Sequence, residues 1–396
     1  MASAKSEASE NITQHLEPVY ISDGKLFTYS SSGKTIQIES AYIEDMRERQ
    51  EKSKQLAGWK EGTTWDTSFA QMSGMGERHE EGIIQFSSVT RSNSRKLLYC
   101  LKGAGFGGLF EFCFDTKKEK RLMHRQNLDF RDLSRPNADG QVLCCSVQQG
   151  GNADITMMKA NESSYKDLTA GDTIDTAPSW VWDQPNHIVY QSQGIARDIE
   201  GYIKGVSPSE IILLNTQSGE LKTIFSSNDT DYLKPQVSQN GNLYFITRPY
   251  ESNEYSRSSA ALDALFFPFR LLRAVFHYLN FFSLLYSRKP LTSANGPQVR
   301  KDAKDVILQG RRIDTEKALR KGTHANGMPS LVPANWVLMR CDKQGNQEIL
   351  ATHVASYSLG EDDNIIYSNG CGIFYITPEG KHEKVLQEKL IEDILM

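Results

Sequence analysis

Several groups of residues come close to known catalytic motifs but lack a required member. The segment GVSPS around Ser207 lacks the last glycine of the G-x-S-x-G turn that exposes a nucleophilic serine. His79 is followed by Glu80 and Glu81, but no second histidine follows at the H-E-x-x-H spacing that places two zinc ligands on one helix face. The sequence therefore predicts neither a serine-hydrolase site nor this kind of zinc site.

Glycine, acidic residues and cysteine also occur in suggestive places. The run GAGFGGLF from Gly103 resembles part of a phosphate-binding loop, but a strand pattern follows it instead of a helix, so we interpret it as a tight turn. The segment GEDDN from Gly360 lacks EF-hand spacing and is typical of a hairpin turn. Cys113, Cys144 and Cys145 lie in expected strands and are interpreted as small core residues. No catalytic, cofactor-binding or metal-binding residue is predicted.

The segment with the most distinctive composition is ALDALFFPFRLLRAVFHYLNFFSLLY, at 261–286. On a helical period Arg270, Arg273 and His277 fall on one stripe, and large apolar side chains cover most of the remaining circumference. From 259 to 322 there are twelve Lys or Arg and five Asp or Glu, a net charge of +7. Since the whole chain carries −4, the remainder carries about −11. This basic excess is confined to one region and has no recognised binding module, so nucleic acid is not a predicted partner.

The composition of the whole chain is that of an ordinary soluble globular protein, with 396 residues, of which 39% are hydrophobic and 24% charged. The first residues, MASAKSEASENITQHLEP, have no apolar core of the kind a secretory signal needs, and we expect a flexible tail over 1–17. The six cysteines lack the dense spacing of a secreted disulfide scaffold. Together these features favour a reducing cytoplasmic compartment.

A repeated pattern organises most of the chain. Six segments consist of an apolar strand, a short polar turn and a second strand, as in a β-hairpin. They begin at Lys25, Leu109, Ile155, Glu210, Trp336 and Gly372. Upstream of several hairpins lies a further pair of short strands, so each unit has four strands. Units of four strands that recur about every 40 to 57 residues are typical of β-propeller blades. The first unit has no obvious innermost strand ahead of Val19, so ring closure is expected to use a strand from elsewhere in the chain.

Three of the upstream segments resemble a known family. The sequences from Pro136 (PNADGQVLCCS), Pro178 (PSWVWDQPNHIVYQS) and Pro235 (PQVSQNGNLYFIT) are similar to the WD40-like repeats of TolB-type six-bladed propellers. Val237 replaces the Trp of the pattern in one copy, and the first and last units match only in layout. The resemblance implies an all-β fold, a six-bladed β-propeller over 18–396. It does not imply a function, because such propellers host binding, scaffolding and several enzymatic chemistries.

Two segments are expected to lie outside the repeat. The range 41–60 is rich in Glu, Arg, Lys and Gln, follows a capping Ser40, and predicts an exposed helical connector between the first two blades. The range 251–335 is a helical, apolar and basic insertion in the fifth blade, because LYFIT before it and WVLMRC after it read as two strands of one unit.

The apolar stretch is long enough to span a bilayer, which needs about 20 residues. However, Arg270 and Arg273 lie near its middle, at a cost of roughly 2.5 to 3.5 kcal/mol each, and a single crossing would separate two strands of one blade. Two alternatives stay open: an interfacial helix on an anionic membrane, or a helix packed against the propeller itself or a partner. The predicted contact residues are Phe266, Phe267, Phe269, Arg270, Leu272, Arg273, Phe276, Leu279, Phe282, Leu285, Arg288 and Lys289.

These observations lead to two hypotheses about function. The first is a non-enzymatic, cytoplasmic interaction scaffold whose 259–322 insertion docks it to a membrane surface or to a membrane-associated protein, with no cofactor. The second is a propeller enzyme, a hydrolase or lyase, with its active site at the mouth of the central channel, where a small-molecule ligand would bind. Residues that meet at a propeller mouth come from different blades, so sequence spacing does not reveal them.

Overall fold

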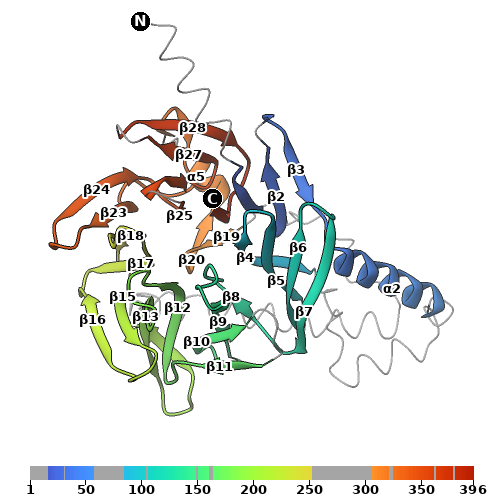
Figure 1. Cartoon of the computed structure of the whole chain (residues 1–396), viewed down its shortest axis with the longest axis horizontal. Coiled ribbons are helices and arrows are strands. Elements are labelled where there is room, and N and C mark those ends of the chain that lie inside the picture. Colours follow the sequence, from blue (N-terminus) through green and yellow to red (C-terminus); the bar gives the residue numbers. More distant parts are fainter. Residues whose placement is uncertain are drawn as a thin grey trace, which may run out of the picture.

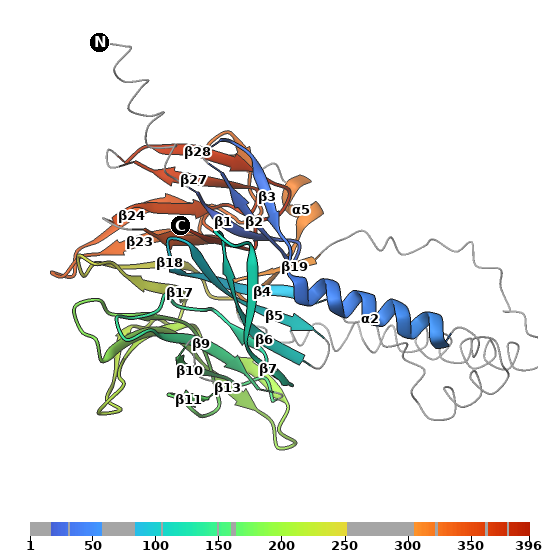
Figure 2. The same cartoon turned by 45° about the vertical axis from the view of Figure 1, so that its right-hand side comes forward.

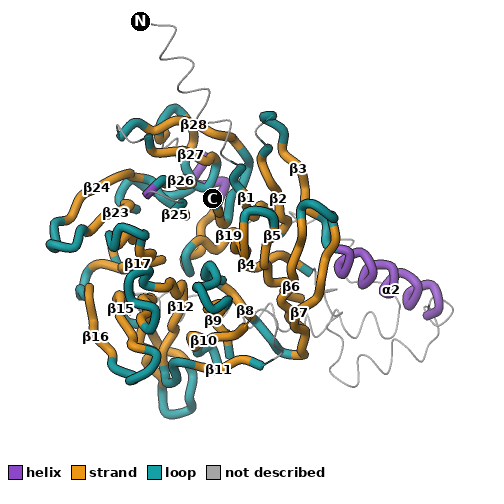
Figure 3. Tube along the Cα trace, in the orientation of Figure 1, coloured by secondary structure: helices purple, strands orange, loops and turns teal. Residues whose placement is uncertain are grey.

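The computed structural model describes most of the chain. The described residues are 17–30, 32–57, 84–103, 106–148, 150–159, 164–251, 305–320, 324–360, 363–377 and 380–396. Strands dominate in these ranges, and the helices within them are α2 (Ala41–Ala57) and the short α5 (Thr315–Arg320) (Figure 3). The all-β prediction is therefore confirmed for the described part of the chain. Neither of these helices is long and apolar enough to cross a membrane.

The N-terminal and C-terminal ends of the described chain meet in one sheet, which we call the closing sheet. Its strands, in spatial order, are β29 (Asp393–Leu395), β1 (Val19–Ser22), β2 (Lys25–Tyr29) and β3 (Thr35–Ile38). β29 pairs antiparallel with β1, with Val19 opposite Leu395 and Ile21 opposite Asp393. As expected, a strand from elsewhere in the chain, β29, takes the innermost place next to β1.

The next sheet follows the helix α2. Its strands are β4 (Gln85–Asn93), β5 (Lys96–Gly103), β6 (Phe106–Cys113) and β7 (Lys118–Gln126). Ser40 caps α2 through its Oγ, which accepts a hydrogen bond from the Ile43 amide at 3.4 Å. The helix occupies the range for which the sequence predicts a connector, and 58–60 lies outside the described residues. The glycine-rich run joins β5 to β6, with Gly103 opposite Phe106, as expected for a tight turn.

Two further sets of strands are joined in a nine-stranded sheet by one parallel bridge, Ala153 to Ile174. The first set is β8 (Phe130–Arg131), β9 (Gln141–Val147), β10 (Ala153–Lys159) and β11 (Tyr165–Asp167). The second set is β12 (Thr173–Trp180), β13 (His187–Arg197), β15 (Glu210–Asn215) and β16 (Leu221–Phe225), with β14 (Ile203–Val206) added to an extension of β13.

The following sheet contains the insertion. Its strands are β17 (Thr230–Val237), β18 (Leu243–Pro249), β23 (Val337–Cys341) and β24 (Gln347–Thr352). β18 pairs with β23, with Leu243 opposite Cys341, so the two strands that flank the insertion are neighbours as predicted. The apolar stretch at 261–286 lies outside the described residues. The described part of the insertion is mostly two small hairpins, β19 (Asp305–Leu308) with β20 (Arg311–Asp314) and β21 (His324–Ala325) with β22 (Met328–Pro329), and α5 is its helical part.

The last sheet is β25 (Ser356–Leu359), β26 (Ile365–Ser368), β27 (Gly372–Ile376) and β28 (His382–Gln387). The sheets are arranged around a common centre, with β25 and the C-terminus that follows β29 near it and β3, β7, β16 and β24 at the periphery (Figure 1). The segment GEDDN connects β25 to β26, and the Gly360 amide donates to the Asn364 carbonyl oxygen at 2.8 Å, as in the predicted hairpin turn.

Because neighbouring strands of a sheet are antiparallel, their connections alternate between two faces of the ring. The connections β8–β9, β12–β13 and β17–β18 share one face, which we call the cavity face. The connection β3–β4, which contains α2, and the connection β18–β23, which contains the insertion, share the opposite face, the insertion face. In agreement, α2 and β19 lie toward the same side of the molecule in Figure 2.

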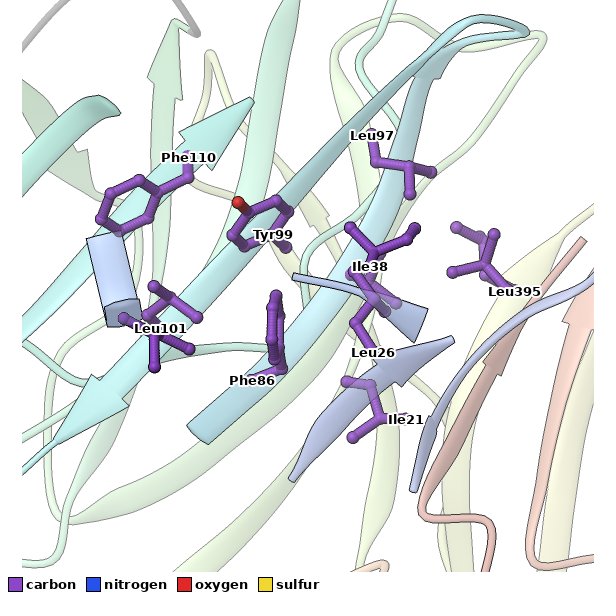
Figure 4. Packing of buried hydrophobic residues seen from close by; sticks show 12 residues of the cluster. Ile21, Leu26, Ile38, Phe86, Leu97, Tyr99, Leu101, Phe110 and Leu395 are labelled. Carbon is purple, nitrogen blue, oxygen red and sulfur yellow. The ribbon is translucent and has the colours of Figure 1, made fainter. Parts of the chain in front are cut away.

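The core consists of layers of apolar side chains between adjacent sheets. Between the closing sheet and the β4–β7 sheet, Ile21, Leu26, Phe86, Tyr99 and Leu395 pack together (Figure 4). Leu395 brings the last described strand into this layer and is 7% exposed. Sheet-to-sheet packing of this kind means that each layer depends on both sheets that form it.

Ring closure by β29 leads to a stability prediction. Ile394 is 3% exposed and packs with Tyr20, Ile366 and Ile373. We expect Ile394→Ala to lower the free energy of unfolding by about 2 to 5 kcal/mol, because it removes a buried side chain from the closing strand. The matched control is Ile349→Ala in β24, where the side chain is 63% exposed; its cost should stay below about 1 kcal/mol in the same denaturant titration. Equal costs for the two variants would contradict the role given to β29.

Candidate functional site in the central cavity

A cavity of about 210 Å³ lies at the centre of the ring. Every sheet around it contributes part of its innermost strand or the segment just after that strand. The lining residues are 88–90, 132–138, 177–182, Pro185, 234–239, 358–360 and 393–395. Because Ala138, Pro185 and Gln239 belong to the connections of the cavity face, the cavity extends to that face. This is the hollow in which a propeller of this kind would hold a ligand.

Neighbouring sheets are joined near the centre by side chains that accept hydrogen bonds from the backbone of the next sheet. All of these side chains come from innermost strands or the residues just after them, except Gln191, which lies in β13. The physical reason is the same for each contact. A strand at the centre has no neighbouring strand on its inner side, so its backbone amides need other hydrogen-bond acceptors. The contacts are Leu133 N to Ser88 Oγ (2.8 Å), Ala177 N to Asp132 Oδ2 (3.2 Å), Lys234 N to Gln191 Oε1 (2.7 Å), Leu359 N to Gln236 Oε1 (3.2 Å) and Met396 N to Ser358 Oγ (3.1 Å).

Three residues at these contacts have a left-handed backbone. Asp132, Ala177 and Lys234 have φ of 50°, 50° and 51°. The register of β12 shifts at Ala177 and that of β17 shifts at Lys234, which marks β-bulges. A non-glycine residue in this region costs of order 1 to 3 kcal/mol and persists only where its surroundings hold it. The cross-sheet hydrogen bonds stabilise the left-handed backbone at these three residues. The backbone that follows each of them lines the cavity.

The floor of the cavity contains a half-buried ion pair, whose side chains are 16% and 28% exposed. Lys234 Nζ contacts Asp393 Oδ1 and donates to Ser356 Oγ at 2.7 Å, and Ser356 Oγ donates to the same Asp393 oxygen at 2.7 Å. The Tyr357 hydroxyl donates to the Lys234 carbonyl oxygen at 2.6 Å. Three innermost strands, β17, β25 and β29, therefore meet at one ammonium group. Ser356 is fully buried, so its hydroxyl serves this network and is not presented to a substrate.

Asp132 differs from the other charged groups of the floor. Its side chain is exposed to the cavity, which opens at the cavity face, while the ring surrounds it on the other sides and replaces part of the bulk water there. This desolvation raises the pKa of Asp132 above its usual range, the negative charge of Asp393 raises it further, and Lys234 offsets only part of the shift. A carboxyl group with a raised pKa in a concave site is a recognised indicator of function.

The rim of the cavity combines arginine with tryptophan. Arg91 Nε and Arg135 Nη2 donate to the Met396 carbonyl oxygen at 3.0 and 3.1 Å, and a second nitrogen of Arg91 donates to the Glu17 carbonyl oxygen at 2.6 Å. These contacts hold the two ends of the described chain against β4. Trp182, like Arg135, is one of the lining residues, and it is 47% exposed, which is unusual for so large an apolar side chain.

A second cluster of charged groups anchors the described part of the insertion. Arg248 Nε contacts Asp231 Oδ2 at 2.8 Å, and the two side chains are 6% and 2% exposed. The guanidinium groups of Arg248 and Arg311 lie 4.8 and 5.9 Å from the ring of Trp336, which is fully buried. Arg311, from β20, also pairs with Glu251 at 2.9 Å. The hairpin β19–β20 is thereby fixed to the sheet from which the insertion leaves.

The residues singled out from the sequence fall into three groups. His79 and all twelve predicted contact residues lie outside the described residues. Ser207 Oγ accepts a hydrogen bond from the Gly194 amide at 2.8 Å, so it has a structural partner at the edge of β13. Cys144 and Cys145 are fully buried core residues as predicted, and burial raises the pKa of both thiols. Cys113 is a correction, because it ends β6 next to a turn and is only half-buried.

The floor residues were not found from the sequence. Ala177 and Lys234 each precede a proline that marks the repeat, Pro178 and Pro235, so their equivalent positions were visible. What was not visible is that Lys234 meets Asp393, 159 residues further along the chain. Within the described ranges, no group of three or more His, Cys, Asp or Glu side chains is arranged to hold a metal ion.

Comparison with solved structures relates this ring to known proteins. TolB from Acinetobacter baumannii superimposes with a TM-score of 0.50 at 10% identity, over 96% of this chain and 66% of that chain. A chain of the nidogen/laminin complex superimposes with a TM-score of 0.50 at 5% identity, over 96% and 97% of the two chains. The fold is a TolB-like β-propeller. The expected resemblance is confirmed at the level of fold, and this propeller spans just under two thirds of the TolB chain. No protein-family model and no curated protein matches the sequence.

The raised pKa of Asp132 leads to a prediction with a defined sign. When the pKa of a carboxyl group is higher in the folded than in the unfolded state, stability falls as the pH rises from the unfolded pKa through the folded pKa. We expect Asp132→Asn to keep the acceptor for the Ala177 amide, to be more stable than the wild-type propeller at pH 7, and to match it below about pH 4, where both side chains are neutral.

The measurement is the free energy of unfolding from denaturant titrations of both proteins across this pH range. The matched control is Asp139→Asn, in an exposed turn of the cavity face, which should differ from wild type by less than about 0.5 kcal/mol at each pH. A variant at position 132 that is less stable than wild type at pH 7 would show that ionised Asp132 stabilises the ring.

Proposed function

We propose that this protein is a non-enzymatic interaction scaffold, a propeller with six four-stranded blades, whose 259–322 insertion docks it to an anionic membrane surface or to a membrane-associated protein. Six sets of four strands around the cavity support the blade number. The two alternatives for the partner differ in chemistry. We give the membrane the first place, because basic residues accompany the apolar stretch on both its polar stripe and its C-terminal side.

The observation that carries this proposal is the anchored base of the insertion. Arg311 is tied to Glu251 and to the Pro249 carbonyl oxygen at 2.9 and 3.0 Å, at the point where the chain leaves β18. Leu308 is 1% exposed and packs with Leu331 and Trp336. A segment that served only as a loose connection would not need an arginine paired to the sheet and a buried leucine at its base. An insertion that is fixed to the sheet in this way can hold the whole propeller at the surface that the insertion binds, and this supports a docking role.

The enzyme alternative, a hydrolase or lyase with its site at the channel mouth, has one observation in its favour. Asp132, Lys234 and Asp393 converge on the cavity, so the channel is not lined by apolar and small residues alone. Against it, Lys234 and Ser356 are engaged with each other and with Asp393 at the joint between innermost strands. These groups have a sufficient structural role. The scaffold function is therefore the better supported of the two.

The proposal is tested by co-sedimentation with anionic vesicles, using phosphatidylserine in phosphatidylcholine. We expect replacement of Arg270, Arg273, Arg288 and Lys289 by glutamine to reduce the membrane-bound fraction at least about tenfold, since each basic residue near such a surface contributes about 1 kcal/mol. These substitutions leave the anchored base at Leu308 and Arg311 intact, so loss of binding cannot be assigned to damage of the ring.

The matched control removes the same number of positive charges from the propeller. Lys117, Lys118, Lys120 and Arg121 are exposed on β7 and the turn before it, and their replacement by glutamine should leave the bound fraction within about twofold of wild type. If wild type and both variants stay equally in the supernatant, the proposal of membrane binding is wrong, and a partner protein becomes the proposed binding partner of the insertion. If both variants lose binding equally, the contact is non-specific.

A further inference from the structure

The charges at the cavity floor are not balanced. The ammonium group of Lys234 is held by Asp393 and Ser356, which leaves Asp132 without a cation of its own at the floor. The neighbouring Arg131 makes a two-point contact with Asp129, at 3.0 and 2.7 Å, and is committed there. The floor thus has two carboxyl groups and one ammonium group, while Arg135, the other cation among the lining residues, donates to the Met396 carbonyl oxygen at the rim.

The carboxyl group of Asp132 has one atom engaged. Its Oδ2 accepts the hydrogen bond from the Ala177 amide at 3.2 Å, and among the described residues no hydrogen bond reaches Oδ1. A single available oxygen suits an ammonium group, which is a compact point charge. It suits a guanidinium group less well, because the planar fork of guanidinium is best matched by both oxygens of a carboxylate. An anion is disfavoured, because the floor's only ammonium group already has its partners.

The walls above the floor are apolar and narrow. Pro136, Pro178, Val181 and Leu359 line the cavity, and Trp182 stands exposed toward the cavity face. A volume of about 210 Å³ is below the range of roughly 300 to 1,000 Å³ that is usual for drug-sized ligands. It is suited to one extended side chain. Tryptophan is the strongest cation–π partner among the aromatic side chains, so its place at the mouth favours the entry of a cation.

We propose that the central cavity binds the ammonium group of a lysine side chain from a partner polypeptide, with Asp132 receiving the ammonium group and Trp182 packing against the alkyl chain at the mouth. This site is on the cavity face, and it is independent of the insertion and of the proposed membrane docking. The bound lysine would supply the positive charge that the floor lacks. Its chain of methylene groups would replace water along the apolar walls, which is where most of the binding energy would come from.

The test titrates three probes into the full-length protein at pH 7 and follows binding by calorimetry and by tryptophan fluorescence. The probes are Nα-acetyl-lysine methylamide, its norleucine counterpart, which lacks the ammonium group, and pentylammonium chloride. We expect the lysine probe to bind with a Kd of about 1 mM or tighter, and the norleucine probe to bind at least about tenfold more weakly. Equal binding of these two probes, or no binding of the lysine probe, overturns the proposal. Binding of pentylammonium alone overturns the polypeptide as the source of the amine.

Variants then separate charge recognition from folding. Asp132→Asn keeps the hydrogen-bond acceptor for Ala177 and should weaken the lysine probe at least about tenfold, while Asp139→Asn, on the same face but outside the cavity, should stay within about twofold. Unchanged affinity in Asp132→Asn overturns the role of that carboxyl group. The insertion variant with four glutamines should bind the lysine probe like wild type, so failure of membrane docking and failure of this site are read separately.

Discussion

The ring depends on the pairing of β29 with β1, because this is where the described ends of the chain meet. Backbone hydrogen bonds join the two strands, and the Asp393 side chain reaches across the centre to Lys234 of another sheet. A propeller gains closed layers of side chains between all neighbouring sheets only when this last joint forms. The joint is therefore the point at which local hairpins become one cooperative structure.

The same interactions shape the cavity. At the centre of the ring, the inner edges of the innermost strands face each other across a space too wide for a β-ladder, so side chains take over the hydrogen bonding. Ser88, Gln236 and Ser358 of the innermost strands, and Gln191 of the neighbouring strand β13, are used in this way without a net charge. Asp132 is used in the same way but brings a charge with it. Asp132 is thus both the acceptor of a hydrogen bond between sheets and the candidate binding group of the cavity.

The two faces of the ring carry different chemistry. On the insertion face, a buried cluster of Arg248, Asp231, Arg311 and Trp336 fixes the base of a basic and apolar segment. On the cavity face, short polar turns surround a narrow opening with Trp182 beside it. Alternation of antiparallel connections separates the two faces, so the described base of the insertion and the cavity mouth lie on opposite faces. Two contacts with different partners are compatible on one scaffold.

The sequence by itself determined the local structure: the polar turns, the apolar strands, the helix over 41–57 with its Ser40 cap, the position of the insertion between β18 and β23, and hence the type of fold. These features depend on residues that are close together in the sequence, so the periodicity of apolar and polar residues predicts them. The tertiary structure decided that β29 completes the closing sheet, that Lys234 meets Asp393 across 159 residues, and that Asp132 faces the central cavity. Contacts between distant strands depend on ring closure and on burial from all sides, and no spacing along one chain encodes either of them.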